Sequence, residues 1–121
     1  MLAGLRVLVV EDELFVAMEL ERLVADAGGI VVGPSGDLDA ALNLAAGDVD
    51  AAVLDVKLDH VTSAPIATAL SARHIPYLLI TGYEATAVPP DLQGAPRLTK
   101  PYGDRDFYAA VKTHLLPALG R

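Results

Sequence analysis

The feature that most constrains this chain is a series of short strand-like runs, each followed at once by a polar side chain. The runs are residues 6–10, 51–54, 78–80 and 97–99, and the polar positions behind them are Glu11 with Asp12, Asp55, Thr81 and Lys100. If the runs are parallel strands of one sheet, these polar groups all lie at its carboxyl edge, where open α/β sheets bind ligands. Carboxylates, a hydroxyl and an ammonium group at one edge suit a divalent cation and a phosphoryl group.

The segments between the runs show helical periodicity. In residues 14–27, Val16, Leu20 and Leu23 recur at helical spacing, and Gly28 with Gly29 ends the segment. We expect helices over 14–27, 38–46 with Asp37 as its cap, 63–74 and 104–116, and strands over 5–10, 30–32, 51–55, 77–81 and 96–99. This alternation implies a parallel α/β sheet with right-handed crossovers, a single (βα)5 domain over residues 1–121.

Residues 82–95 depart from the alternation. A helix is expected there, but Gly82, Pro89, Pro90 and Gly94 leave little room for one. We therefore expect a short or mobile fourth helix between the last two strands.

Composition excludes several classes of protein. The chain of 121 residues is 53% hydrophobic and 21% charged, which argues against disorder. No apolar run approaches the ~20 residues of a membrane helix, and no signal peptide precedes the first strand, so we expect a cytoplasmic protein without a membrane partner. The chain has no cysteine, which excludes disulfides and thiolate metal sites.

The net charge of −7 is unevenly distributed. Residues 1–60 carry 12 acidic and 3 basic side chains, whereas residues 61–121 carry 4 acidic and 6 basic ones. No basic stripe is present, so we expect no nucleic acid as a partner. Solubility alone accounts for exposed acidic groups, but not for Glu11, Asp12 and Asp55 behind buried strands.

Each of these polar residues alone is weak evidence. An aspartate after a strand is commonly a helix cap, Lys-Pro is an ordinary dipeptide, and Thr81 before Gly82 is compatible with simple turn chemistry. Their joint order along one set of strands is much less ordinary. In that order the chain resembles, over essentially its whole length, the receiver domain of two-component response regulators.

The resemblance implies a flavodoxin-like fold with strand order 2-1-3-4-5. It also implies a site in which each residue has a role. Magnesium is bound by Glu11, Asp12, Asp55 and the backbone carbonyl of Lys57; Asp55 takes the phosphoryl group; Thr81 is the switch hydroxyl; and Lys100, before a cis bond to Pro101, pairs with the phosphoryl oxygens.

The physical chemistry of the side chains agrees with these roles. Packing Glu11, Asp12 and Asp55 together is unfavourable without a cation, because like charges raise one another's pKa. Mg²⁺ relieves that repulsion, which leaves Asp55 able to act as a carboxylate nucleophile and form an acyl phosphate. Lys100 then supplies a positive charge to the transferring oxygens.

Two further features of the resemblance concern the last two predicted strands and the residues that follow them. Residues 78–83 resemble the "FAT GUY" subgroup of receivers, although Leu78 and Leu79 depart from its pattern. Most receivers have an aromatic residue three positions before the lysine, where this chain has Arg97. Tyr102 and Tyr83 are the candidate substitutes, and aromatic packing on a loop is the alternative for each.

The remaining candidate groups carry less information. The ammonium group of Lys57 either leans over the phosphoryl group or is a solvated surface lysine. His60, His74 and His114 are scattered and lack a second metal ligand at suitable spacing, so we expect all three on the surface.

The sequence thus predicts a stand-alone receiver, with no output domain after its last helix, in a magnesium-dependent phosphorelay. Its expected partner is a histidine kinase or a histidine phosphotransfer protein, and its only catalysis concerns its own phosphorylation. The alternatives are a docking scaffold that works without phosphorylation and a receiver fragment of a hybrid histidine kinase. A haloacid-dehalogenase-like phosphatase lacks support because the chain has no D-x-D after the first strand, and a dinucleotide-binding domain because it has no G-x-G-x-x-G.

Overall fold

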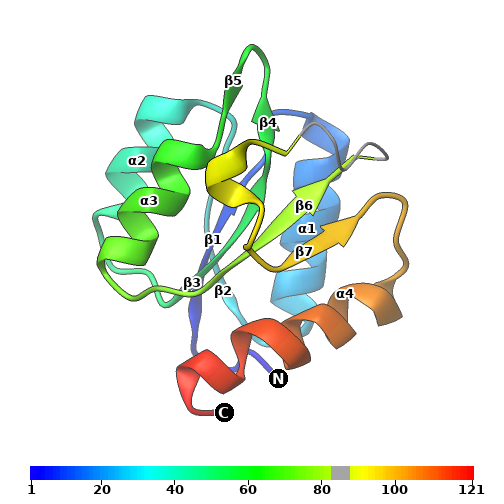
Figure 1. Ribbon diagram of the computed structural model, residues 1–121. Helices are drawn as coiled ribbons and strands as arrows, with labels where there is room; N and C mark the ends of the chain where they lie inside the picture. Colours follow the sequence, from blue (N-terminus) through cyan, green and yellow to red (C-terminus); the bar gives the residue numbers. More distant parts are fainter. Residues whose placement is uncertain (83–87) are drawn as a thin grey trace.

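The computed structural model of the chain describes residues 1–82 and 88–121. Its main sheet has five parallel strands in the order β2-β1-β3-β6-β7 (Figure 1). In chain order they are β1 (Arg6–Val10), β2 (Ile30–Ser35), β3 (Ala51–Asp55), β6 (Tyr77–Thr81) and β7 (Arg97–Thr99). The strands therefore lie in the predicted order 2-1-3-4-5, and the flavodoxin-like fold is confirmed.

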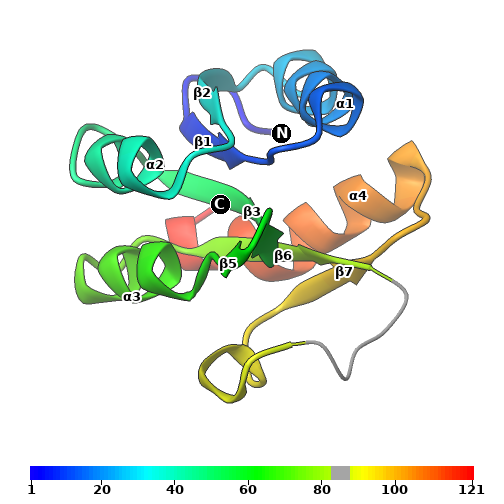
Figure 2. The same cartoon turned by 90° about the horizontal axis from the view of Figure 1, so that it is seen from above.

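Helices cover both faces of this sheet (Figure 2). One face is covered by α1 (Leu14–Asp26) and α4 (Asp104–Ala110), and the other by α2 (Leu38–Ala45) and α3 (Ala64–Ala72). A π-helical segment, Val111–Leu115, and a 3-10 turn, Pro117–Leu119, continue the chain beyond α4. The expected final helix over 104–116 is thus one continuous helical stretch whose inner residues Phe107, Val111 and Leu115 are buried, as predicted.

The strands are buried on both faces, which explains their continuous aliphatic runs. Leu8 and Val10 of β1 pack on the α2–α3 side, whereas Val7 and Val9 pack on the α1–α4 side. The alternation of side chains along a strand therefore divides the core into two layers, one on each face of the sheet.

Local signals in the sequence account for the helix ends. The carboxylate of Asp37 accepts a hydrogen bond of 2.9 Å from the backbone N–H of Ala40, so Asp37 caps α2 as predicted. Pro65 lies in the first turn of α3, where its missing N–H costs nothing. Gly28, just after α1, has φ +88°, a conformation that glycine adopts without strain.

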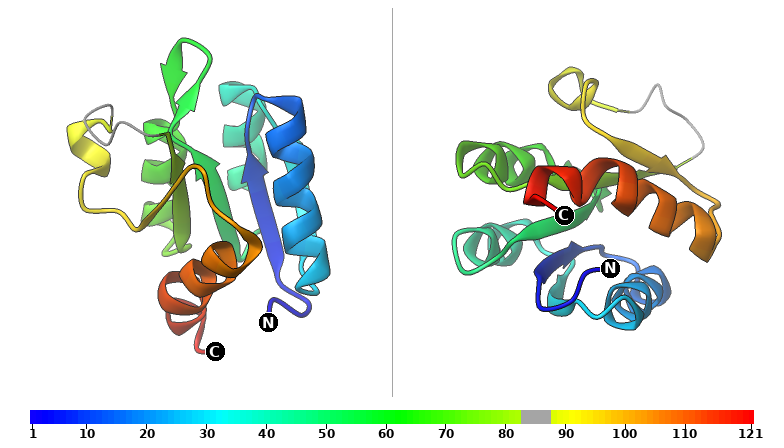
Figure 3. Two further views of the ribbon diagram at one scale, coloured as in Figure 1. Left: turned by 90° about the vertical axis from the view of Figure 1, so that its right-hand side faces the viewer. Right: turned by 90° about the horizontal axis from the view of Figure 1, so that it is seen from below.

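Two parts of the backbone differ from the sequence prediction. The second strand, expected over 30–32 and ended by Gly33-Pro34, continues through Pro34 to Ser35. Because β2 is an edge strand, a proline without an N–H is tolerated there. A hairpin of β4 (Lys57–Leu58) and β5 (Val61–Thr62), which the sequence did not predict, follows β3 and projects beyond the carboxyl edge of the sheet (Figure 3).

The segment between β6 and β7 agrees with the expectation of a short helix. In the part of residues 82–95 that the structure describes, the chain forms one 3-10 turn, Pro90–Leu92. Val88 and Leu92 anchor this part of the chain in the core beside α3. Tyr83 lies outside the described residues, so its predicted role as a substitute aromatic is not addressed.

Candidate functional site

The carboxyl ends of β1 and β3 bring three acidic side chains together. Val10 of β1 is paired with Leu54 of β3, so Glu11, Asp12 and Asp55 follow neighbouring strands at the same height. One carboxylate oxygen of each residue lies within 4.8 Å of those of the other two. Glu11 and Asp55 are buried, and Asp12 is exposed. The predicted acidic cluster therefore forms.

Lys100 enters the same site from the end of β7. Its Nζ lies 3.3 Å from Oδ2 of Asp55 and 3.6 Å from Oε2 of Glu11. The backbone N–H of Lys100 donates a hydrogen bond of 2.8 Å to the carbonyl of Thr81, which fixes the loop beside β6. The bond from Lys100 to Pro101 is cis, as expected. Partial burial disfavours the charged ammonium, but the charges of Asp55 and Glu11 outweigh it and raise the pKa of Lys100.

Glu11 is the most strongly perturbed carboxyl group of the cluster. Burial, followed by its contact with Asp55, raises the pKa of Glu11 from the ordinary 4.5 to about 8. Its Oε1 accepts a hydrogen bond of 3.0 Å from the backbone N–H of Glu13, whereas its Oε2 is buried and receives no hydrogen bond from the described residues. A buried carboxylate oxygen in this position has capacity for one further positive partner.

A cavity of about 630 Å³ opens directly over the cluster. Asp12, Asp55, Thr81 and Lys100 contribute to its wall, and the hairpin β4–β5 forms one side. The hydroxyl of Thr81 is buried and has no hydrogen-bond partner among the described residues. A polar atom of this kind at the edge of a cavity is available to a ligand oxygen.

Lys57 lies at the rim of the same cavity. Its backbone N–H donates a hydrogen bond of 3.3 Å to Oδ1 of Asp55, which helps to hold the carboxylate in place. The residue is exposed, and among the described residues its ammonium group forms no ion pair. This placement agrees with the interpretation of Lys57 as a surface lysine.

Sequence reasoning missed two parts of the site. At the tip of the hairpin, the backbone N–H of Asp59 donates a hydrogen bond of 2.9 Å to Oδ2 of Asp12. Two residues, Asp59 and His60, between two strand-like pairs were the available signal for this hairpin. The other part is Gly36, where a Cβ would lie 2.8 Å from the Cα of Asp12. Only a residue without a side chain fits behind Asp12 at this distance.

Arg97 stands where most receivers have an aromatic residue, and Tyr102 is its candidate substitute. The two side chains make their contacts on opposite faces of the sheet. Tyr102 is half-buried on the α1–α4 side, where its ring stacks with Phe107 at 6.3 Å between centroids. Burial, with the charges of nearby carboxylates, raises the pKa of Tyr102 to about 12. Arg97 instead donates hydrogen bonds to the carbonyls of Leu92 and Gln93. The three histidines, His60, His74 and His114, are exposed, as predicted.

The donor set fits a hard divalent cation. Three carboxylate groups converge within a few ångströms, one of their buried oxygens lacks a donor among the described residues, and burial together with the nearby Asp55 raises the pKa of Glu11. Mg²⁺ prefers such oxygen ligands and tolerates a site that also keeps several waters. No helix within residues 1–82 and 88–121 has the length and apolar character needed to cross a membrane.

Comparisons with known proteins agree with this fold. No protein-family model matches the chain, and no curated protein does. Among solved structures, SdrG from Sphingomonas melonis Fr1 is 35% identical, with 100% of each chain covered and a TM-score of 0.80. The BeF3-activated conformation of SdrG from Pseudomonas melonis Fr1 is also 35% identical, with 98% of each chain covered and a TM-score of 0.75.

A response regulator receiver protein from Sinorhizobium medicae WSM419 shares the fold. It is 21% identical, covers 93% of this chain and 95% of its own, and has a TM-score of 0.77. A parallel sheet of this order, with an acidic cluster at its carboxyl edge and a lysine beside it, defines a signalling domain of the two-component class. The chain belongs to the family of response-regulator receiver domains. Its place in the "FAT GUY" subgroup stays a prediction.

Proposed function

We propose that this chain is a stand-alone receiver that accepts a phosphoryl group from a phosphohistidine onto Asp55. The observation that carries the proposal is the position of the Lys100 ammonium, 3.3 Å from Oδ2 of Asp55, in an acidic cluster whose Glu11 and Asp55 are buried. In the transfer, an oxygen of Asp55 forms a bond to phosphorus as the N–P bond breaks. The electron pair of the broken bond returns to the imidazole nitrogen of the donor.

Glu11, Asp12 and Asp55, with the backbone carbonyl of Lys57, are the proposed magnesium ligands. Bound Mg²⁺ would neutralise part of the charge of the carboxylates and of the phosphoryl oxygens. The hydrogen bond from the Lys57 amide keeps Asp55 oriented toward the cavity. The ammonium group of Lys100 would stabilise the negative charge that develops on the phosphoryl oxygens, in addition to the charge that Mg²⁺ would neutralise.

Thr81 is the proposed reporter of the phosphorylated state. Its hydroxyl is buried beside Asp55 without a partner among the described residues, so a phosphoryl oxygen would be its first acceptor. Forming that hydrogen bond would reposition the backbone at the end of β6. The 35% identical SdrG has a BeF3-activated conformation, which supports a response of this kind here.

The N-terminal part of α1 offers a surface for the phosphodonor. Leu14, Phe15 and Met18 expose 67%, 79% and 53% of their surface. Phe15 borders a hollow of about 430 Å³ together with Lys100 and Tyr102, so this apolar surface adjoins the phosphorylation site. A histidine kinase or a histidine phosphotransfer protein, acting in the cytoplasm, is the proposed partner. The chain would act on no substrate but its own aspartate.

The test is phosphorylation of the isolated chain with acetyl phosphate and Mg²⁺, followed by intact-mass spectrometry. One added phosphoryl group is expected in the unaltered chain and in Asp59→Asn, which changes a carboxylate at the rim of the same cavity. None is expected in Asp55→Asn.

Three other outcomes separate the alternatives. Phosphorylation of Asp55→Asn would move the acceptor elsewhere. If Mg²⁺ binds but neither acetyl phosphate nor a phosphorylated kinase modifies the chain, the docking scaffold becomes the better account. Binding to a kinase that is independent of Asp55 would point the same way.

A further inference from the structure

The segment from Val88 to Gln93, between β6 and β7, lacks the hydrogen bonds of a regular helix. It contains one 3-10 turn, Pro90–Leu92, and two prolines that have no N–H to donate. The carbonyls at the end of such a turn have no partner within the turn itself. Besides the burial of Val88 and Leu92, contacts from outside the turn hold this part of the chain in place.

The carbonyl of Leu92 accepts a hydrogen bond of 3.1 Å from the backbone N–H of Ala95, and two side chains add further hydrogen bonds. The guanidinium of Arg97, at the start of β7, donates to the carbonyls of Leu92, at 3.3 Å, and Gln93. The side-chain amide of Gln93 donates in turn to the carbonyl of Val88 at 2.6 Å. A continuous set of contacts therefore runs from β7 through the 3-10 turn to Val88.

Val88 forms part of the wall of the cavity over Asp55. Only 4% of its surface is exposed, and it lines the cavity together with Asp55 and Thr81. An apolar side chain at this place limits the access of water to a group bound at Asp55. The backbone carbonyl of Val88 is linked to the turn, and so to Arg97, through the side chain of Gln93.

We propose that Arg97 is a positioning residue of the phosphorylation site, which acts through Gln93 and Val88 to hold one side of the cavity wall, which limits the approach of water to Asp55. The inference rests on the proposed function, because it concerns the lifetime of a phosphoryl group on Asp55. Arg97 touches neither Asp55 nor the bound group and takes no part in the transfer itself. Its contribution is to hold the backbone from Val88 to Gln93.

The experiment compares Arg97→Met with Arg73→Met. Arg73 is a matched control, since its guanidinium also donates to two carbonyls, those of Ala45 and Gly47, at the opposite end of the sheet. Each variant is phosphorylated with acetyl phosphate and Mg²⁺, the donor is removed, and the decay of the phosphorylated mass is followed. Hydrogen exchange of the Leu92 amide, whose N–H donates to Pro89, is measured in the same proteins.

Arg97→Met is expected to shorten the lifetime of the phosphorylated form by about threefold or more, because water reaches the acyl phosphate more easily. It is also expected to speed exchange of the Leu92 amide. Arg73→Met should change neither, and Arg97→Lys, which keeps a donor, should restore part of the lifetime. Gln93→Met, which breaks the next contact, should act in the same direction as Arg97→Met.

The outcomes separate this inference from the proposed function. If the unaltered chain takes up no phosphoryl group, the proposed function fails and the inference fails with it. If the unaltered chain is phosphorylated and the lifetimes of Arg97→Met and Arg73→Met are equal, only the inference fails. Faster amide exchange in Arg97→Met without a shorter lifetime would reduce Arg97 to a structural role and overturn the inference as well.

Discussion

The backbone N–H of Asp59 donates a hydrogen bond of 2.9 Å to Oδ2 of Asp12, across 47 residues of sequence. This contact ties the tip of the hairpin β4–β5 to a carboxylate of the acidic cluster. Asp59 also has φ 57°, so the tip adopts the left-handed conformation in which an aspartate is tolerated better than most residues. The conformation of the hairpin and the charge of Asp12 are therefore directly connected.

The first prediction is that Mg²⁺ perturbs the hairpin through this contact. A cation drawn to Asp12 competes for the oxygen that accepts the Asp59 hydrogen bond, so the NMR signal of the Asp59 amide should shift as Mg²⁺ is added. Asp12→Asn keeps an acceptor oxygen but loses the charge, and should abolish the shift while leaving the hairpin folded. If the NMR signal of the Asp59 amide did not shift while Mg²⁺ bound saturably, the link between Asp12 and the hairpin would be contradicted.

The second prediction concerns pH. Because the pKa of Glu11 is raised to about 8 in the folded chain, the folded state holds a proton that the unfolded chain has lost above its ordinary pKa of 4.5. The free energy of unfolding without Mg²⁺ should therefore fall as pH rises between these two values. Mg²⁺ must displace the same proton, so its apparent affinity should rise up to about pH 8 and then level off.

Urea unfolding at several pH values, with EDTA or with Mg²⁺, measures both effects. Glu11→Gln is the matched control, since it keeps the size of the side chain and cannot titrate. This variant should be less sensitive to pH across the window. An equal pH dependence in Glu11→Gln and the unaltered chain would assign the effect to another group.

The third prediction concerns Gly36. A Cβ at this position would lie 2.8 Å from the Cα of Asp12 and 3.2 Å from its Cβ, so Gly36→Ala must displace the backbone of the cluster. Overpacking of this kind costs about 1–3 kcal/mol of unfolding free energy. Because the displaced residue is a proposed ligand, Mg²⁺ binding should also weaken several-fold.

Gly94→Ala is the control for this substitution, since no atom of residues 1–82 or 88–121 lies within 4 Å of the place its Cβ would occupy. Urea unfolding and isothermal titration with Mg²⁺ should leave Gly94→Ala close to the unaltered chain. If Gly36→Ala lost stability but bound Mg²⁺ normally, the close approach would matter for folding alone.

The sequence predicted the architecture well because its main elements are signalled locally. The aliphatic runs of β3 and β6 match residues 51–55 and 77–81 without adjustment, since strands buried on both faces need continuous apolar sequence. The acidic cluster followed from topology, as polar residues after parallel strands meet at one edge. Lys100 lies beside Asp55 for the same reason.

What the sequence did not predict depends on contacts between distant residues. The hairpin β4–β5 has strands of only two residues each, too short for a periodic pattern. Its tip is held by Asp12, and no local rule relates Asp59 to Asp12. Arg97 was recognised only as a departure from the usual aromatic, because its partners are backbone carbonyls that come within reach only once the 3-10 turn forms.

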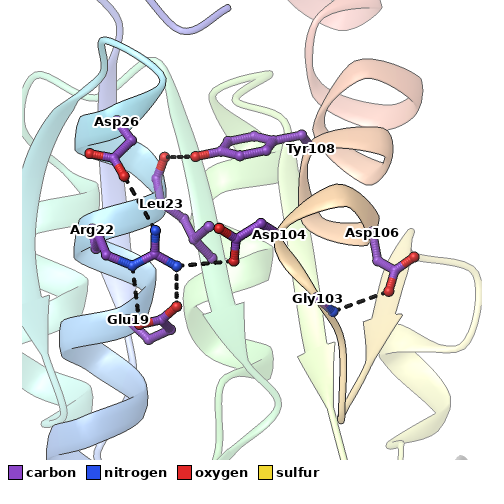
Figure 4. A network of polar contacts seen from close by, with 8 residues as sticks. All are labelled: Glu19, Arg22, Leu23, Asp26, Gly103, Asp104, Asp106 and Tyr108. Atoms are coloured by element: carbon purple, nitrogen blue, oxygen red, sulfur yellow. Dashed lines mark hydrogen bonds and ion pairs between the residues drawn. The ribbon is translucent and has the colours of Figure 1, made fainter.

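The fourth prediction concerns the contact between α1 and α4 (Figure 4). Arg22 of α1 pairs with Glu19, Asp26 and, at 3.0 Å, with Asp104 of α4, while the hydroxyl of Tyr108 donates a hydrogen bond of 2.8 Å to the carbonyl of Leu23. The ion pairs are about half exposed, so solvent and salt screen them, whereas the hydrogen bond is partly buried. Tyr108→Phe should therefore lower the free energy of unfolding by about 1 kcal/mol at any salt concentration.

Arg22→Met should have a smaller effect, and one that disappears as salt is added, since only the screened charge pairs are lost. Urea unfolding at low and high concentrations of sodium chloride measures both variants under the same conditions. Lys112→Met, a change of charge outside this network, controls for the general effect of net charge. A loss in Arg22→Met that is larger than that of Tyr108→Phe and insensitive to salt would contradict this ranking. Because methionine keeps most of the apolar stem of arginine, such a loss would lie in hydrogen bonds of the guanidinium that salt does not screen.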